Sequence, residues 1–297
     1  MSLADKLRSA CPAVKSQEPL SRHTSLAIGG PADYYAEVTT AHQLIALRRL
    51  VDQNQLPVFF LGAGSNLLVS DRGIRGLVIH LHGDFRIIEF KENHVKVGAA
   101  AMMPTLAKQA AERGLSGVES LIGVPGTIGG GLVMNAGTRE GWLGNVVSSV
   151  HVLGDSLKIE TLTAEAFGFS YRKSNLEGRW VIGAELTLKS EESASIMKRI
   201  ESLLQYRSRT QPLATSNCGS VFKNPPEGPA AQWIEKAGFK GAGFGGARVS
   251  ERHANFIVNE KNANAADVRT LMSRIQEKVL KEFNVRLEPE VKLVGEW

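Results

Sequence analysis

Two glycine-rich stretches constrain the fold of this chain more than any other feature. Residues 62–66 read Gly-Ala-Gly-Ser-Asn, and residues 123–131 read Gly-Val-Pro-Gly-Thr-Ile-Gly-Gly-Gly. Glycine adopts positive φ and lets the backbone approach a ligand closely, so successive small residues can point several N–H groups at one anion. One such stretch alone is more often an ordinary tight turn. Two of them in one strand-rich half favour phosphate binding.

The first stretch does not match the usual dinucleotide-binding turn. Gly62 and Gly64 lack a third glycine at the right offset, and residues 67–71 do not continue as a convincing helix. Both features belong to the Rossmann fingerprint. The sequence therefore predicts phosphate-binding loops in a different kind of fold.

Composition limits the class of protein. The chain has 297 residues, 43% hydrophobic and 22% charged, which indicates a globular protein with more than one packed unit. A net charge of +5 would steer a polyanionic substrate, but no basic run interleaved with aromatics favours nucleic-acid binding. Cys11 and Cys218 are too few and too far apart for a metal site or a disulfide framework. With no signal-like start and no long apolar run, we expect a cytoplasmic protein without membrane contact.

The pattern of elements predicts an α+β fold with at least two units. The first half is rich in strands and glycine loops, and the second half alternates helix and strand. Asn264 and Asp267 are spaced almost as a capping box at the start of the clearest helix. The expected helices are 41–54, 104–113, 191–205, 229–237 and 264–283; the expected strands are 56–61, 77–81, 86–90, 94–99, 146–153, 157–162, 180–188, 254–258 and 285–294.

A series of motifs runs in order along the chain from about Thr24 to the last strand. Among them are Leu-Gly-Ala-Gly-Ser-Asn-Leu-Leu-Val at 61–69, Met-Asn-Ala-Gly at 134–137, Phe-Ser-Tyr-Arg-Lys-Ser at 169–174, Gly-Ser-Val-Phe-Lys-Asn-Pro at 219–225, His-Ala-Asn-Phe at 253–256 and Leu-Glu-Pro-Glu-Val at 287–291. Together with the glycines at 123–130, they resemble the UDP-N-acetylenolpyruvoylglucosamine reductase (MurB) family.

The resemblance implies a two-lobed FAD-binding domain of the vanillyl-alcohol-oxidase (PCMH) type and a C-terminal α+β substrate domain. The lobes would be residues 1–75 and 76–192, and the substrate domain 193–297. No metal is implied. The expected cofactor-binding residues are Gly62, Ala63, Gly64, Ser65, Asn66, Leu67, Gly123, Pro125, Gly126, Thr127, Gly129, Gly130, Asn135 and Ala136.

The family reaction belongs to peptidoglycan synthesis. NADPH reduces the flavin, and the hydride then passes to the enolpyruvyl ether of UDP-N-acetylglucosamine enolpyruvate, giving UDP-N-acetylmuramate. Hydride addition pushes charge into the substrate carboxylate, and a proton must reach the ether-bearing carbon, so the site needs a cation and a proton donor. By the resemblance, Arg172 holds the carboxylate, Ser220 donates the proton, and Glu290 acts as acid or orients the transfer.

Each of these residues also has a plain structural interpretation. Arginine after tyrosine is usually at the surface, serine after glycine usually lies in a turn, and Glu288 and Glu290 share the face of a strand, usually a solvated one. The resemblance favours the functional interpretation, with Ser220 polarised by Lys223, Arg172 or a water. It also implies substrate binding by four further residues, namely Tyr171, Lys223, Asn224 and Arg207.

Some features depart from the family pattern. The run 138–144 differs from the usual family sequence, and Cys218 beside Ser220 would make the enzyme sensitive to oxidation. No insertion for a substrate-closing tyrosine loop is found between Ile182 and Ser220, which indicates the shorter subgroup. No obligate protein partner is evident. The alternatives are a flavin oxidase that uses oxygen, a non-catalytic flavin- or nucleotide-sugar-binding protein and, least favoured, a nucleic-acid-binding protein.

Overall fold

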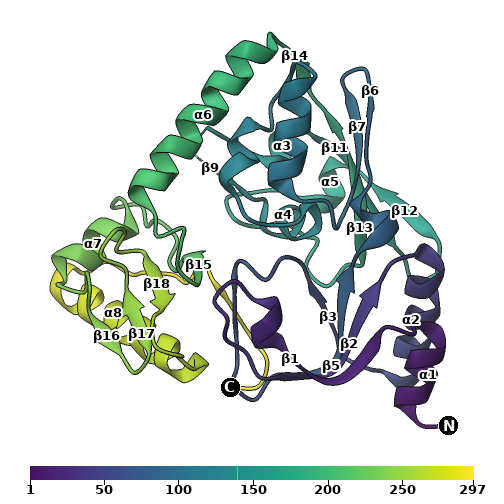
Figure 1. Cartoon of the computed structure of the whole chain (residues 1–297), viewed down its shortest axis with the longest axis horizontal. Helices are drawn as coiled ribbons and strands as arrows, with labels where there is room; N and C mark the ends of the chain where they lie inside the picture. The colour runs from purple at the N-terminus through teal and green to yellow at the C-terminus, as the bar shows by residue number, and fades with distance from the viewer. Residues whose placement is uncertain (139) are drawn as a thin grey trace. The chain divides into compact units, whose positions relative to one another are not determined.

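The chain divides into two compact units, each built from discontinuous segments. The computed structural model describes residues 1–138 and 140–297 (Figure 1). Unit 1 comprises residues 1–16, 34–63 and 76–206, and unit 2 comprises 17–33, 64–75 and 207–297. Both units mix helices with sheets, so the α+β class is confirmed. Within the unusual run 138–144, Arg139 lies outside the described residues.

The larger sheet of unit 1 has five strands in the order β12-β11-β13-β7-β6. Its pairings are antiparallel, with Val150 opposite Ala184 and Gly183 opposite Gly98. Burial does not alternate regularly along β11, where Ser149–Val150 and Val152–Leu153 are buried as consecutive pairs, whereas β13 alternates from Ala184 to Thr187. The strands are β6 (Ile88–Lys91), β7 (His94–Gly98), β11 (Val147–Leu153), β12 (Ile159–Leu162) and β13 (Val181–Thr187).

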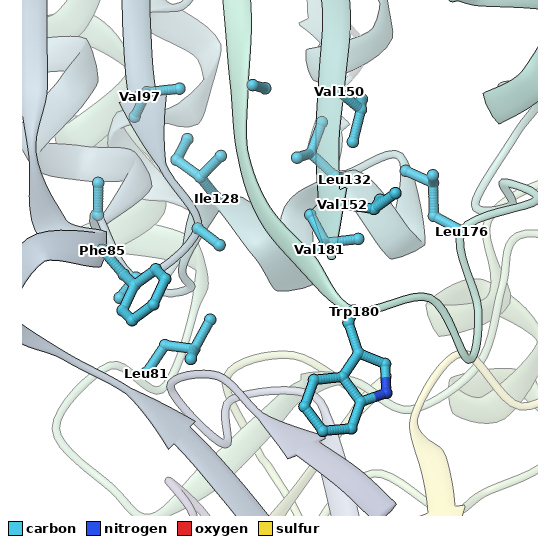
Figure 2. Close-up of a cluster of buried hydrophobic side chains, with 14 of the residues drawn as sticks. Leu81, Phe85, Val97, Ile128, Leu132, Val150, Val152, Leu176, Trp180 and Val181 are labelled. Carbon is cyan, nitrogen blue, oxygen red and sulfur yellow. The ribbon is translucent and has the colours of Figure 1, made fainter. Parts of the chain in front are cut away.

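The hydrophobic core of unit 1 contains side chains from this sheet and from helix α4 (Ile128–Met134). Figure 2 shows Val150, Val152 and Val181 of the sheet beside Leu132 of the helix. All four are at most 6% exposed. This core fixes the short helix that contains the last three glycines of the second stretch.

A second sheet has four strands in the order β1-β2-β5-β3, with β3 parallel to β5. Helices α1 (Leu3–Ala10) and α2 (Ala41–Asn54) contact each other. The expected boundaries of α2 are confirmed, and the Thr40 side chain accepts a hydrogen bond from the Gln43 N–H as its cap. The strands are β1 (Val14–Pro19), β2 (Pro31–Val38), β3 (Val58–Leu61) and β5 (Ile74–Leu81).

The second glycine stretch is not one continuous loop, contrary to expectation. Thr127 is the N-cap of α4 and its Oγ1 accepts from the Gly130 N–H, so Gly129 to Gly131 lie inside the helix.

Unit 1 also contains short strands that pair two by two, and further helices. The strands are β8 (Leu115–Ser116), β9 (Gly137–Thr138), β10 (Gly141–Trp142) and β14 (Lys189–Ser190). The helices are α3 (Met103–Glu112), α5 (Ala164–Phe167), α6 (Ser193–Thr210, which continues into unit 2) and the 3-10 helices Gly83–Arg86, Glu119–Gly123 and Leu143–Asn145.

Unit 2 is built on an antiparallel sheet in the order β15-β18-β17-β16. The Asn264–Asp267 capping box is confirmed at the start of α8, which contacts β16, β17 and helix α7. The strands are β15 (Asn217–Ser220), β16 (Gly243–Phe244), β17 (Ala247–Val249) and β18 (Phe256–Asn259); the helices are α7 (Ala230–Lys236), α8 (Ala265–Phe283) and the 3-10 helix Leu20–His23.

The expected final strand 285–294 is wrong for most of its length. Only β19 (Lys292–Val294) forms, in parallel with β4 (Leu67–Val69). Pro289 makes an isolated bridge with Phe222. Because proline has no N–H to donate to a ladder, regular pairing does not extend through this segment.

Helices long and apolar enough to cross a bilayer are absent from the described part of the chain.

Candidate functional site

The two glycine stretches meet in unit 1 at Gly62 and Thr127. A Cβ placed on Gly62 would lie 2.7 Å from Thr127 Oγ1, closer than real side-chain contacts allow. Thr127 itself is 6% exposed, so it cannot move away easily. The contact brings the end of β3 beside the start of α4, where the Ile128 N–H donates to the Ala101 carbonyl at 2.8 Å and the Gly130 N–H donates to Thr127 Oγ1 at 3.4 Å.

The second stretch is held by its neighbour, residues 99–103. The Met103 N–H donates to the Gly126 carbonyl over 2.9 Å, and the Gly129 N–H donates to the Ala99 carbonyl over 2.8 Å. A Cβ on Gly129 would also approach Ala99 Cβ to 3.1 Å. The Gly129 amide is therefore engaged inside the protein and is a poorer candidate for phosphate than the sequence suggested. Gly129 is needed there for close packing.

The first stretch continues into unit 2, where Gly64 has φ +63° and no room for a side chain. The Gly64 carbonyl accepts from the Ser25 N–H at 3.1 Å. Ser65 lies at the turn, and within the described residues its hydroxyl has no hydrogen-bond partner. The Asn66 side chain was expected to contact the cofactor, but its Nδ2 donates to the Glu290 carbonyl at 3.1 Å. One of its two amide hydrogens is thus used to hold Glu290.

Arg172 lies in unit 1 on a tight turn, with φ +53°. Its guanidinium donates to the Gly137 carbonyl at 2.9 Å and lies 5.3 Å from the centre of the Tyr171 ring. Asn135 is 3% exposed, and its side chain donates to the Ser170 carbonyl at 2.9 Å. The expected cofactor residue Asn135 therefore braces the turn that carries Arg172. Tyr171 is 49% exposed.

Ala136 follows Asn135 and is engaged through its backbone. Its N–H donates to the Gly131 carbonyl and its own carbonyl accepts from the Leu143 N–H, both at 2.8 Å. These bonds link the end of α4 to the 3-10 helix at 143–145. They leave only the Ala136 side chain to face a ligand.

Ser220 and Glu290 come together in unit 2. The Glu290 N–H donates to the Val221 carbonyl at 2.8 Å, and the next pairing along is the Phe222–Pro289 bridge. Two residues 70 positions apart in the sequence therefore lie on adjoining backbone segments. The Ser220 hydroxyl forms no hydrogen bond with any residue that the structure describes, so it is available to an external partner.

The two glutamates expected to share a face differ in their surroundings. Glu288 is exposed and pairs with Lys223 at 3.4 Å, whereas Glu290 is half-buried. Both glutamates bond the Ser220 segment through the backbone: the Lys223 N–H donates to the Glu288 carbonyl at 2.9 Å, and the Glu290 N–H donates to the Val221 carbonyl at 2.8 Å. Glu290 is bonded nearer to Ser220 and is the less exposed of the two.

Three expected substrate residues lie in unit 2. Lys223 points to Glu288 and not to the Ser220 hydroxyl. The Asn224 side chain accepts from the Ala230 N–H at 2.9 Å, at the start of α7. Arg207 is half-buried, and burial lowers its pKa. Its guanidinium has no hydrogen-bond or ion-pair partner among the described residues, an arrangement that an anion would stabilise.

Cys218 is not the reactive thiol that its position suggested. It is 1% exposed, and burial raises its pKa to about 12. Because the thiolate is the reactive form, the expectation of oxidation sensitivity is wrong for the folded chain. The thiol packs in the core of unit 2.

Sequence reasoning gave no role to Ser25 or Asn255. The Ser25 hydroxyl donates to the Asn217 carbonyl at 2.6 Å and so joins the Gly64 turn to the strand of Ser220. Asn255 bonds the backbone of Phe222 with both ends of its amide. The motif at 253–256 was the only signal for Asn255, and it did not say what the asparagine does.

In the part of the chain that is described, no group of His, Cys, Asp or Glu side chains could hold a metal ion.

Comparisons with known proteins cover nearly the whole chain. The family model of the FAD binding domain matches residues 32–157, and that of the UDP-N-acetylenolpyruvoylglucosamine reductase C-terminal domain matches residues 211–294. UDP-N-acetylenolpyruvoylglucosamine reductase 2 of Symbiobacterium thermophilum is 47% identical over 298 residues, covering 99% of this chain and 97% of that protein. The chain belongs to the UDP-N-acetylenolpyruvoylglucosamine reductase family. The Moorella thermoacetica reductase is 41% identical and covers 95% of this chain and 94% of its own length.

Solved structures agree with this family assignment. The Thermus caldophilus reductase (MurB) superposes with a TM-score of 0.83 at 37% identity, covering 94% of this chain and 98% of that one. A variant of berberine bridge enzyme gives a TM-score of 0.51 at 11% identity, over 65% of this chain and 44% of its own. The second likeness concerns the fold alone. The FAD-binding fold expected from the sequence is confirmed.

Proposed function

We propose that this chain is an FAD-dependent, NADPH-oxidising reductase that converts UDP-N-acetylglucosamine enolpyruvate to UDP-N-acetylmuramate for peptidoglycan synthesis. Membership of the reductase family over the full chain supports the reaction class. The observation that carries the residue assignment is the placing of Glu290 against the Ser220 segment, with the serine hydroxyl unbonded.

We assign the glycine stretches to the bound dinucleotide because the FAD binding domain model matches residues 32–157. Gly62 and Gly64 are needed for close packing within the protein, since a Cβ on Gly62 would meet Thr127 Oγ1 and a Cβ on Gly64 would meet the His23 carbonyl. The unbonded Ser65 hydroxyl offers a donor for a phosphate oxygen. Bound FAD, reduced by NADPH, supplies the hydride for the substrate. The remaining expected cofactor-binding residues belong to the same proposal, because they lie in or next to the two glycine stretches.

The protein's own residues supply the charge and the proton. Arg172 binds the substrate carboxylate, and its contact with the Gly137 carbonyl fixes the direction of the guanidinium fork. Ser220 gives its hydroxyl proton to the ether-bearing carbon. Glu290, held through its backbone by Asn66 and Val221, orients that transfer or replaces the proton.

Substrate binding involves the remaining cationic and polar residues. Arg207 binds the diphosphate, since its half-buried guanidinium has no partner among the described residues. Tyr171, Lys223 and Asn224 contact the nucleotide sugar, with Lys223 changing partner from Glu288. Arg207 and Lys223 add positive charge for a polyanionic ligand.

The finer assignments belong to the same proposal. The chain is a member of the shorter subgroup without the tyrosine loop, it acts in the cytoplasm, and it needs no obligate protein partner. Its lobes are residues 1–75 and 76–192, with a substrate domain at 193–297.

A spectroscopic titration tests the proposed reaction. Purified protein should be yellow, anaerobic NADPH should bleach it, and UDP-N-acetylglucosamine enolpyruvate should restore the colour. A protein whose colour returns faster with oxygen than with the sugar would be an oxidase. A yellow protein that NADPH does not bleach would be a binding protein, and either outcome would overturn the proposal.

A further inference from the structure

The backbone around Ser220 is irregular. Asn217 pairs with Val258 and Ser220 pairs with Phe256, so three steps on β15 match two on β18. Gly219 lies inside this bulge with φ +77°, and its N–H donates to the Asn217 side chain. A bulge redirects the side chains that follow it. The direction of the Ser220 hydroxyl therefore depends on how the next residues are fixed.

Asn255 fixes those residues from the β18 side. The ladder between β15 and β18 ends at Ser220 and Phe256, yet the Asn255 carbonyl still accepts from the Val221 N–H at 2.9 Å. Its side chain then accepts from the Phe222 N–H at 3.0 Å and donates to the Phe222 carbonyl at 2.8 Å. The side-chain amide thus makes the two hydrogen bonds to Phe222 that the backbone of one further strand residue would otherwise make.

The asparagine is itself tightly constrained. It is 4% exposed, and its N–H donates to His253 Nδ1 at 3.3 Å. Burial lowers the pKa of His253, and the charge of Lys240 lowers it further, which favours the neutral ring that can accept this bond. The side-chain orientation is unambiguous, because the Phe222 carbonyl can only accept and must face the amide nitrogen.

The opposite side of the same backbone carries Glu290. Its N–H donates to the Val221 carbonyl, while the Asn255 carbonyl receives the Val221 N–H. Residues 221 and 222 therefore lie between Asn255 and the Glu290 segment, and Ser220 directly precedes them. Loss of the Asn255 side chain would remove both hydrogen bonds at Phe222 and leave this side of the backbone held only by the bond between the Val221 N–H and the Asn255 carbonyl.

We propose that Asn255 is a positioning residue for Ser220, which sets the hydroxyl for proton delivery without touching the substrate. The inference rests on the proposed role of Ser220. It predicts a defect confined to the half-reaction in which the substrate is protonated. A purely structural role would weaken folding or flavin binding and would affect both half-reactions.

Stopped-flow half-reactions of the full-length flavin-loaded enzyme test it. In Asn255→Ala, reoxidation by UDP-N-acetylglucosamine enolpyruvate should slow about 10- to 100-fold, the range that a misplacement of about 1 Å produces. Bleaching by NADPH should change less than about twofold. Asn255→Asp keeps the acceptor and loses the donor, and should fall between wild type and Asn255→Ala. Equal slowing of both half-reactions would overturn the inference.

Asn259 provides the matched control. It is the last residue of β18, the strand that Asn255 directly precedes, and its side chain also bonds backbone at both ends, to the Leu26 carbonyl at 3.1 Å and the Ala263 N–H at 2.8 Å. Asn259→Ala should lower stability without a selective loss of reoxidation. A selective loss there as large as in Asn255→Ala would overturn the inference.

Two further measurements separate this inference from the role of Ser220. Amide hydrogen exchange at Phe222 should accelerate in Asn255→Ala and remain slow in Asn259→Ala; no acceleration would overturn the inference. In a Ser220→Ala background, Asn255→Ala should slow reoxidation no further. If Ser220→Ala alone leaves reoxidation unchanged, the proposed function of Ser220 fails. If only the Asn255 variants behave as wild type, the positioning role alone fails.

Discussion

The Gly62 contact of unit 1 and the Ser220–Glu290 region of unit 2 are held in different ways. At Gly62 the backbone itself comes close, because a Cβ would meet Thr127 Oγ1 at 2.7 Å. Around Ser220 and Glu290 the backbone is held by asparagine amides, Asn66 at Glu290 and Asn255 at Phe222. Added volume should therefore damage the Gly62 contact, whereas removal of a polar group should damage the Ser220–Glu290 region.

The largest effect is expected from the Ser220 hydroxyl. Ser220→Ala should slow reoxidation by the enol ether about 10²- to 10⁴-fold, the usual contribution of a positioned acid. The rate of flavin reduction by NADPH should stay within about twofold, because that step needs no proton from Ser220. Anaerobic stopped-flow absorbance measures both. Similar losses in the two steps would mean that Ser220 supports the fold and not the proton transfer.

Arg172 tests the charge requirement within unit 1. Arg172→Ala should lower the rate of substrate reduction about 10²- to 10³-fold, as for other removed donors at a developing negative charge. Arg172→Lys should recover part of the loss, because it keeps the charge but not the planar fork. Single-turnover rates at saturating substrate give the comparison. An alanine variant with unchanged rate would remove Arg172 from the site.

Gly62 tests the close approach of the backbone. Gly62→Ala should weaken FAD binding by about 1 to 3 kcal/mol, the usual cost of overpacking, or roughly 5- to 150-fold in Kd. Fluorescence titration of the apoprotein measures it. The double variant Gly62→Ala with Thr127→Ala relieves the overlap and should recover part of the affinity. Unchanged affinity in the single variant would show that the contact has no role in cofactor binding.

The smallest effect concerns Cys218. Its pKa is raised to about 12 when folded, against about 8.5 when unfolded. Above pH 8.5 the unfolded chain releases a proton that the folded chain keeps, so stability should fall as pH rises, by about 1 kcal/mol per unit. Urea unfolding between pH 8 and 10 checks this, and Cys218→Ala should reduce the slope. A native thiol that reacts rapidly with a disulfide reagent would contradict its burial.

Much of the fold could be read from local patterns. The stripe of 264–283 and its Asn264–Asp267 cap are short-range features, and they gave α8 with the right boundaries. The final strand failed because its pairing depends on distant partners: β4 for residues 292–294 and Phe222 for Pro289. The local sequence does not indicate which distant segment a strand will pair with.

The sequence suggested the residues of the candidate site but not the contacts that hold them. The motif at 219–225 is the reason for proposing Ser220, and burial distinguishes Glu290 from the exposed Glu288. The sequence could not show that the side-chain amides of Asn66 and Asn135 donate to the carbonyls of Glu290 and Ser170. Nor could it show that the Gly129 N–H donates to the Ala99 carbonyl. These bonds join residues far apart in sequence, and asparagine or glycine serves equally well in turns and at ligand contacts.

The most direct measurement of the central claim is the colour of the flavin under anaerobic conditions. NADPH should bleach the protein, and one equivalent of UDP-N-acetylglucosamine enolpyruvate should restore the oxidised spectrum while forming UDP-N-acetylmuramate. Ser220→Ala should bleach normally and recover its colour far more slowly. Recovery of the variant at the wild-type rate would contradict the division of labour between the glycine-rich unit and the unit that carries Ser220 and Glu290.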